Sequence, residues 1–104
     1  MRPVKYKLFW AEEFEEWYEE LPLKEQIQID TRISHIQNEG HFGTCKTLGD
    51  DVWELKWVNG RRVYYAHIPP LKLLLLLGGN KNGQDKDIRK AKKILSKYID
   101  RSEN

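Results

Sequence analysis

The stretch that decides the fold is residues 52–65, VWELKWVNGRRVYY, in which two segments rich in apolar residues flank an Asn-Gly pair. Tryptophan, valine and tyrosine around such a pair are typical of a β-hairpin. A two-residue loop would place Arg62 among the tryptophans of the apolar face. A three-residue loop with Gly60 in a left-handed bulge position instead pairs Lys56 with Arg62. The second register keeps the basic side chains off the apolar face, and we therefore predict it.

This register sorts the side chains of the hairpin onto two faces. The face expected to pack on helices carries Trp53, Leu55, Trp57, Val63 and Tyr65. The other face, predicted to be open, carries Glu54, Lys56, Arg62 and Tyr64. Lys56 and Arg62 can hold a phosphate, and Tyr64 offers a ring on which a base can stack. The open face is therefore a candidate binding site for single-stranded RNA.

Two further lysines are predicted at the edges of this face. Lys46 lies one strand away, and Lys81 lies in the loop of residues 78–84 after the last strand. Together with Lys56 and Arg62 they would form a shallow cationic cleft. The competing interpretation is that the basic strand residues are solvated and form cross-strand ion pairs with Glu54.

Hydrophobic periodicity predicts the other elements. They are a strand at 4–9, helices at 14–21 and 23–39, strands at 44–48, 52–57, 61–68 and 71–77, and a helix capped by Asn82. Because residues 71–77 are apolar on both faces, we expect them to form the central strand. The four tryptophans and the isoleucines of the second helix, from Ile27 to Ile36, are expected in the core.

These elements predict an α+β fold. An N-terminal strand and a helix hairpin would pack on a mostly antiparallel sheet of about five strands, with a helix at the C-terminal end. The chain has 104 residues, of which 39% are hydrophobic, and this is sufficient for one core. We therefore expect a single domain over residues 1–104.

Charge is distributed unevenly along the chain, although the formal net charge is only +2. Residues 1–40 contain nine acidic and five basic side chains, whereas residues 41–104 contain seven acidic and thirteen basic ones. A local excess of positive charge attracts polyanions even where the net charge is small. The second part of the chain is therefore the candidate polyanion-binding part.

The remaining residue types indicate no cofactor and no membrane segment. Cys45 is the only cysteine, and with the three histidines it follows no zinc-ligand spacing. The longest apolar run, residues 73–77, is too short to cross a bilayer. We expect a cytoplasmic protein without metal, organic cofactor or membrane partner. Among the histidines, only His41 in its glycine-flanked loop is kept as a catalytic candidate.

Several ordered blocks of the sequence resemble the RelE/HigB-type toxins of bacterial toxin-antitoxin pairs. These toxins belong to the RelE/ParE/HigB-type superfamily, and within it the blocks are similar to the addiction module killer protein branch. The blocks are residues 46–50, 52–56, 62–66, 75–81 and 84–88. The resemblance implies a small sheet packed on a helix hairpin, and a neutralising antitoxin, expected to be of the helix-turn-helix type. In RelE-like members it further implies cleavage of mRNA on the ribosome.

The resemblance also implies roles for three basic residues. Arg62 matches the arginine that contacts the substrate phosphate, and Lys56 matches a basic residue on the preceding strand. Lys81 falls near the basic residue that follows the last strand. In a nuclease of this kind, Arg62 and Lys56 would stabilise charge on phosphorus while Lys81 assists the departing oxygen.

Two positions depart from the family pattern. Glu54 stands where RelE-like toxins have another basic residue, and Ile88 stands where they have a tyrosine on the final helix. The residue that takes the 2′-hydroxyl proton is therefore left open among Glu54, Tyr64 and a neutral lysine.

The leading functional hypothesis is the toxin of a type II toxin-antitoxin pair, acting as a metal-independent, ribosome-dependent mRNA endonuclease that inhibits translation. The first alternative is a ParE-like toxin, which shares the fold but inhibits DNA gyrase by binding and has no nuclease site. A second alternative is a toxin-derived domain that binds RNA without cutting it.

Overall fold

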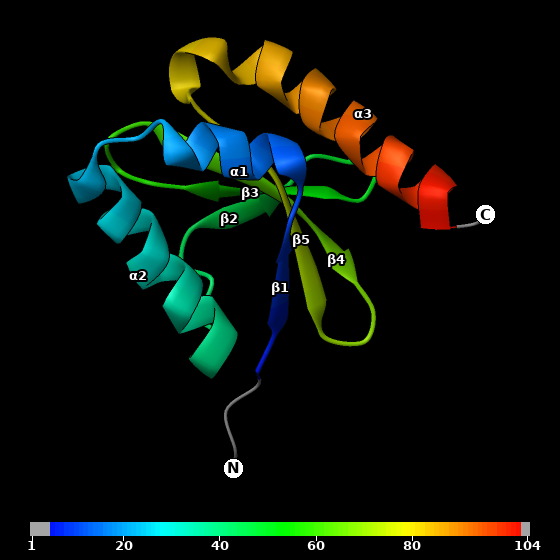
Figure 1. Ribbon diagram of the computed structural model, residues 1–104, viewed down its shortest axis with the longest axis horizontal. Helices are drawn as coiled ribbons and strands as arrows, with labels where there is room; N and C mark the ends of the chain where they lie inside the picture. The colour runs from blue at the N-terminus through cyan, green and yellow to red at the C-terminus, as the bar shows by residue number, and fades with distance from the viewer. Residues whose placement is uncertain (1–4, 103–104) are drawn as a thin grey trace.

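The computed structural model describes residues 5–102, and Figure 1 shows how their elements are arranged. In chain order they are β1 (Lys7–Trp10), α1 (Glu12–Glu19), α2 (Leu23–Glu39), β2 (Cys45–Thr47), β3 (Val52–Lys56), β4 (Arg61–Ile68), β5 (Lys72–Asn80), the 3-10 turn η1 (Lys81–Gly83) and α3 (Gln84–Ser102). The five strands form one sheet in the order β1-β5-β4-β3-β2. Only the β1-β5 pair is parallel, so the predicted α+β fold class is confirmed. Val4 of the predicted first strand lies outside the described residues.

The hairpin between β3 and β4 has the predicted three-residue loop. Lys56 pairs with Arg62, and the backbone N–H of Trp57 donates to the Arg61 carbonyl at 3.0 Å. Gly60 has a φ of 97°, a left-handed conformation in which a side chain is disfavoured. The glycine therefore sets the register, as the sequence indicates, and with it the face on which each hairpin side chain lies.

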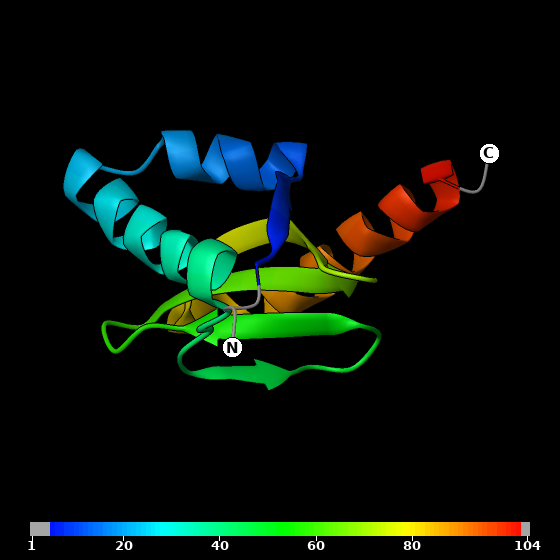
Figure 2. The ribbon, with the colours of Figure 1, turned by 90° about the horizontal axis from the view of Figure 1, so that it is seen from below.

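The helix hairpin of α1 and α2 covers one face of the sheet (Figure 2). Its buried residues are Phe14, Ile29, Ile33 and Ile36, and they pack on Leu55, Val63, Tyr65, Leu73 and Leu75 of the strands. Two core predictions are wrong here. Ile27 is exposed, because it lies two residues before Ile29 and so on the opposite side of α2. No tryptophan of the chain is fully buried: Trp17, Trp53 and Trp57 are partly buried at the margin of the core, and Trp10 is exposed.

Helix α3 covers the other face of the sheet, which was predicted to be open. Ala91, Ile94 and Leu95 pack there on Tyr64, Ala66, Leu74, Leu76 and Leu77. The physical reason is that the apolar stripe of α3 has to be buried, and the face opposite the helix hairpin is the sheet surface available to it. Lys56 and Arg62 remain partly exposed. The part of this sheet face that lies under the middle of α3, including Tyr64 and Ala66, is buried.

Strand β5 is buried on both faces, as its composition predicts, but β4 is the central strand. The difference arises because β1 pairs with the outer side of β5 and extends the sheet there. Strand β5 also runs to Asn80, so part of the predicted loop of residues 78–84 is strand. The predicted cap at Asn82 is wrong as well, because the Asn80 side chain accepts from the Asn82 N–H at 2.9 Å. No helix within residues 5–102 is long and apolar enough to cross a membrane.

Candidate nucleic-acid interface

The four predicted cations are placed around the end of the sheet at which α3 begins. Lys46 is the cross-strand partner of Glu54, and Lys56 is the partner of Arg62. Cross-strand partners project from the same face, and residues 54 and 56 of one strand also share a face. Lys46, Lys56 and Arg62 therefore lie on the α3 side of the sheet, as the register predicts.

Lys81 is brought to the β3-β4 loop by a backbone hydrogen bond. Its N–H donates to the Gly60 carbonyl at 2.8 Å, and its exposed side chain runs along the glycine. A methyl group at Gly60 would lie 3.5 Å from Lys81 Cδ, which is ordinary van der Waals contact. The lysine after the last strand is therefore adjacent to the loop that joins Lys56 to Arg62.

Arg62 is held from one side by protein groups. Its Nε lies 3.3 Å from Oε1 of Glu54, and its Nη1 donates to the Arg61 carbonyl at 2.9 Å. The side chain is 12% exposed, and among residues 5–102 no hydrogen bond involves Nη2. The guanidinium is thus fixed in place with one nitrogen left for an external acceptor, an arrangement suited to phosphate binding.

Glu54 is the counter-ion that fixes Arg62. The side chain is 0% exposed, and Oε2 accepts a hydrogen bond from Gln84 Nε2 at 2.7 Å. A carboxylate without solvent exposure cannot reach a proton of a bound strand, so its predicted place on an open face is wrong. Gln84 is the first residue of α3, and it therefore links the start of this helix to the Arg62 site.

Tyr64 lies under α3 and is 0% exposed, so its ring offers no surface to a base. The sequence prediction failed here because α3 packs on the same face. The hydroxyl has no hydrogen-bond partner among the described residues. Burial, reinforced by the carboxylates of Glu54 and Asp87, raises the pKa of Tyr64 far above its usual value. Its phenol therefore stays protonated in this environment.

Sequence reasoning missed the buried arginine next to the site. Arg61 is 7% exposed and points to the opposite face, where it pairs with Glu25 and donates to Gln28 Oε1 at 2.8 Å. Strand alternation was the available signal, because the predicted register already places Arg61 on the apolar face. Its partners, more than thirty residues earlier, could not be identified from a local pattern.

A family profile matches most of the chain. The family described as "Phage derived protein Gp49-like (DUF891)" matches residues 16–98. The chain belongs to this family. An uncharacterised protein of Haemophilus influenzae strain Rd is similar to this Gp49-like chain, with 38% identity over 82 residues, covering 76% of this chain and 82% of that protein.

Solved structures share the fold of the Gp49-like chain at low sequence identity. The intact E. coli RelBE toxin-antitoxin complex contains a chain with a TM-score of 0.61 and 18% identity, covering 72% of this chain and 95% of that one. The structure of an arginine double mutant of E. coli toxin RelE in the free state matches with a TM-score of 0.62 and 17% sequence identity. This match covers 94% of the present chain and 98% of the RelE chain. The RelE-like fold that the sequence resemblance implies is thereby confirmed.

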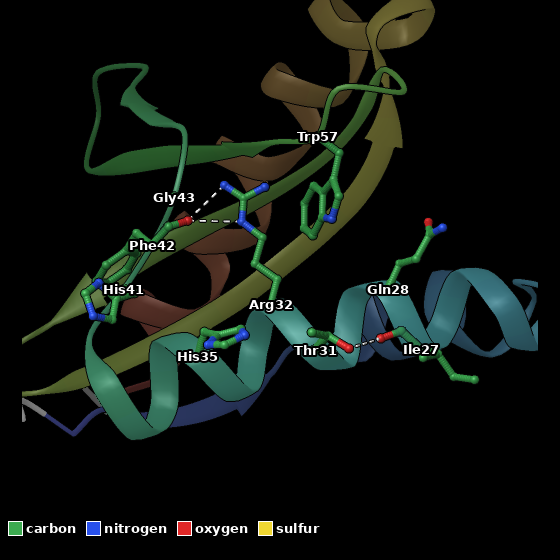
Figure 3. Close-up of a pocket in the computed structure, with 9 residues that line it drawn as sticks. All are labelled: Ile27, Gln28, Thr31, Arg32, His35, His41, Phe42, Gly43 and Trp57. Carbon is green, nitrogen blue, oxygen red and sulfur yellow. Dashed lines mark hydrogen bonds between the residues drawn. The ribbon is translucent and has the colours of Figure 1, made fainter.

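His41 of the Gp49-like chain lies in a different region, shown in Figure 3. It lines an open pocket of about 510 Å³ between α2 and the loop before β2, on the helix-hairpin side. Arg32 crosses this region and stacks over the ring of Trp57 at 4.3 Å. Its guanidinium donates to the carbonyls of Phe42, Thr44 and Lys56. His41 therefore does not lie on the α3 side of the sheet, where Lys46, Lys56 and Arg62 are placed. Arg32 joins α2 to the sheet through the carbonyls of Thr44 and Lys56. Within residues 5–102 there is no grouping of three metal-ligating side chains.

Replacing Arg32 with lysine should lower the free energy of unfolding by about 2 kcal/mol. An ammonium group cannot bond three carbonyls in the geometry of the planar guanidinium, nor stack as well on the indole. Urea unfolding of purified protein measures the change. Arg89→Lys, at an exposed position of α3, is the matched control and should change stability by less than about 0.5 kcal/mol. Equal effects of the two variants would contradict the role of Arg32.

Proposed function

We propose that this Gp49-like chain is the toxin of a toxin-antitoxin pair and that it inhibits translation by cutting mRNA on the ribosome. The observation that carries the proposal is the Arg62 guanidinium, anchored by Glu54 with Nη2 left free of protein hydrogen bonds. Lys46, Lys56 and Lys81 border it. The RelE-like fold supports the toxin assignment, because the similar structures are those of a bacterial toxin.

The chemistry that suits such a site is attack of a ribose 2′-hydroxyl on the adjacent phosphorus. Arg62 and Lys56 stabilise the charge that develops on the phosphoryl oxygens. Lys81, beside the loop, donates a proton to the departing 5′ oxygen. The products are a 2′,3′-cyclic phosphate and a 5′-hydroxyl end. In this scheme, the protein cations supply the electrostatic stabilisation without a metal ion.

An antitoxin is the proposed protein partner. The RelBE complex, which is similar in fold, is a toxin-antitoxin complex. By analogy, we propose a neutralising protein of the helix-turn-helix type, with both proteins acting in the cytoplasm. Co-expression of the chain with the product of an adjacent small reading frame tests the pairing. Recovery of a stable complex and of cell growth supports it, whereas continued growth arrest without a complex contradicts it.

Lys56→Ala should reduce mRNA cleavage about 100-fold on programmed ribosomes. The lysine is half-buried beside Arg62 and carries no ion pair in the described part of the chain, so its removal takes away positive charge at low structural cost. Primer extension on the mRNA measures the cuts. Lys93→Ala removes the same charge from the exposed outer face of α3 and should cleave like the wild type. A similar loss in both variants would indicate a general charge effect.

A gyrase-directed, ParE-like function is the second candidate. The observation in its favour is that Glu54 and Tyr64, two sequence candidates for proton transfer, are both fully buried. A DNA supercoiling assay with purified gyrase separates the two functions. Blocked supercoiling without mRNA cuts would support the gyrase target and refute the nuclease proposal.

A further inference from the structure

A carboxylate that the sequence did not single out lies next to Arg62. Asp87, in the first turn of α3, occupies a notch above two glycines. A methyl group at Gly79 would lie 2.2 Å from Asp87 Oδ2, and one at Gly83 would lie 3.4 Å from it. Gly79 is the cross-strand partner of Arg62. In such a pair of directly opposed residues on adjacent strands, the two Cβ positions are typically about 5 Å apart. The Asp87 carboxylate therefore lies above the position opposite Arg62.

The Asp87 carboxylate is not held by a hydrogen bond or a close ion pair in the described part of the chain; it interacts electrostatically with Lys90 and Lys86. Within residues 5–102, no side-chain hydrogen bond or ion pair is formed by this carboxylate, whereas the Arg62 guanidinium is directed to Glu54 and to the carbonyls of Trp57 and Arg61. Burial raises the pKa of Asp87, while Lys90 and Lys86 act in the opposite direction. An unpaired, half-buried carboxylate costs stability, and such groups are characteristic of functional sites.

Other titratable groups near Asp87 are unsuited to proton abstraction. The charged and titratable groups of this region are Glu54 from β3, Arg62 and Tyr64 from β4, and Asp85, Lys86 and Lys90 from α3. Glu54 and Tyr64 are fully buried, and Glu54 is bound to Arg62 and Gln84. Asp87 is the carboxylate among them that is half-buried and that forms no hydrogen bond or close ion pair within residues 5–102.

We propose that Asp87 is the general base of the site, taking the proton of the 2′-hydroxyl that attacks the phosphate held by Arg62. The inference rests on the proposed nuclease function and deepens it. The 2′ O–H bond breaks and its proton passes to a carboxylate oxygen of Asp87. The 2′ oxygen bonds to phosphorus, the bond from phosphorus to the 5′ oxygen breaks, and the leaving oxygen takes a proton from Lys81. Protons and charge balance without any further reactant.

Asp87→Asn should lower kcat for mRNA cleavage by about 10²–10⁴-fold with little change in KM, because the amide keeps the shape of the side chain but accepts no proton. The wild-type rate should fall on the acid side of neutrality as the carboxylate becomes protonated, and the residual rate of the variant should lack this fall. Asp85→Asn is the matched control. It removes an exposed carboxylate from the same helical turn and should cleave like the wild type.

Stability provides an independent readout. Because the folded state raises the pKa of Asp87, stability falls as the pH rises above the unfolded pKa, and the full cost of the charged form is present above the folded pKa. Asp87→Asn should therefore raise the Tm at pH 7, with the gain vanishing in acid below the unfolded pKa. A merely structural role, such as favourable interaction with the helix dipole, predicts a lower Tm instead.

Gly79→Ala tests the notch itself. The added methyl group displaces a carboxylate at the end of a flexible side chain, so cleavage should fall while the fold is retained. If the wild type cuts mRNA and Asp87→Asn cuts it equally well, the inference is overturned while the nuclease proposal stands. Equal losses in Asp85→Asn and Asp87→Asn would also overturn it. If the wild type makes no cuts, the nuclease proposal fails first, and the assignment of Asp87 falls with it.

Discussion

Replacing Arg62 with alanine is expected to reduce mRNA cleavage by about 10²–10³-fold and to lower the free energy of unfolding by about 3–5 kcal/mol. The activity falls because the anchored guanidinium that would bind the phosphate is gone. Stability falls because the Glu54 carboxylate, 0% exposed, is left without its cation 3.3 Å away. Cleavage on programmed ribosomes and urea unfolding measure the two effects on the same preparation.

A charge-neutral double variant separates the two effects. Glu54→Gln combined with Arg62→Gln removes both members of the buried ion pair, so no charge is left uncompensated. It should recover most of the stability that Arg62→Ala loses and should remain unable to cleave. Recovery of cleavage together with stability would mean that Arg62 acts only through folding, and the proposed site would be wrong.

Gly78→Ala is expected to lower the free energy of unfolding by about 3 kcal/mol. Gly78 is buried in β5, and a methyl group there would lie 2.2 Å from Cε3 of the Trp17 ring. The partly buried indole packs against the core residues beneath α1, so it cannot move aside without displacing its neighbours. Thermal or urea unfolding measures the loss.

The neighbouring glycine supplies the control for this prediction. Gly79→Ala meets the flexible Asp87 carboxylate instead of a ring, so it should cost much less stability. Similar losses at the two positions would show that backbone freedom matters there more than the close approach of Trp17.

Local patterns predicted the hairpin because its determinants are local. Gly60 and the alternation along β3 and β4 are sufficient to select the register, and this correctly placed Lys56 and Arg62 on one face. The helix hairpin was predicted for the same reason, since Gly40 ends α2 in a left-handed conformation with a φ of 70°.

Contacts between distant segments could not be read from the sequence. The pairing of β1 with β5 joins segments that are far apart in the sequence, such as Lys7 and Lys72, and makes β4 the central strand. The packing of α3 over Tyr64 likewise depends on which sheet face remains uncovered once the helix hairpin is in place. This explains why the sequence correctly placed Lys46, Lys56 and Arg62 on one face of the sheet but treated Tyr64 and Glu54 as exposed.

Asp87 illustrates a signal that was present but not decisive. The Gly78-Gly79 pair at the end of an apolar strand indicates a close approach of some other group. The presence of a glycine does not identify the group that approaches it. In the structure, Trp17 lies over Gly78 and Asp87 lies over Gly79. Identifying the carboxylate required the position of α3 relative to β5.

The most direct test of the account is the chemistry of the RNA ends formed on programmed ribosomes by the wild type and by the Glu54→Gln, Arg62→Gln double variant. The account predicts discrete cuts with 2′,3′-cyclic phosphate and 5′-hydroxyl ends for the wild type, and none for the folded double variant. Intact mRNA with the wild type, or the same cuts with the double variant, would contradict the claim that Arg62 binds the phosphate at which the mRNA is cleaved.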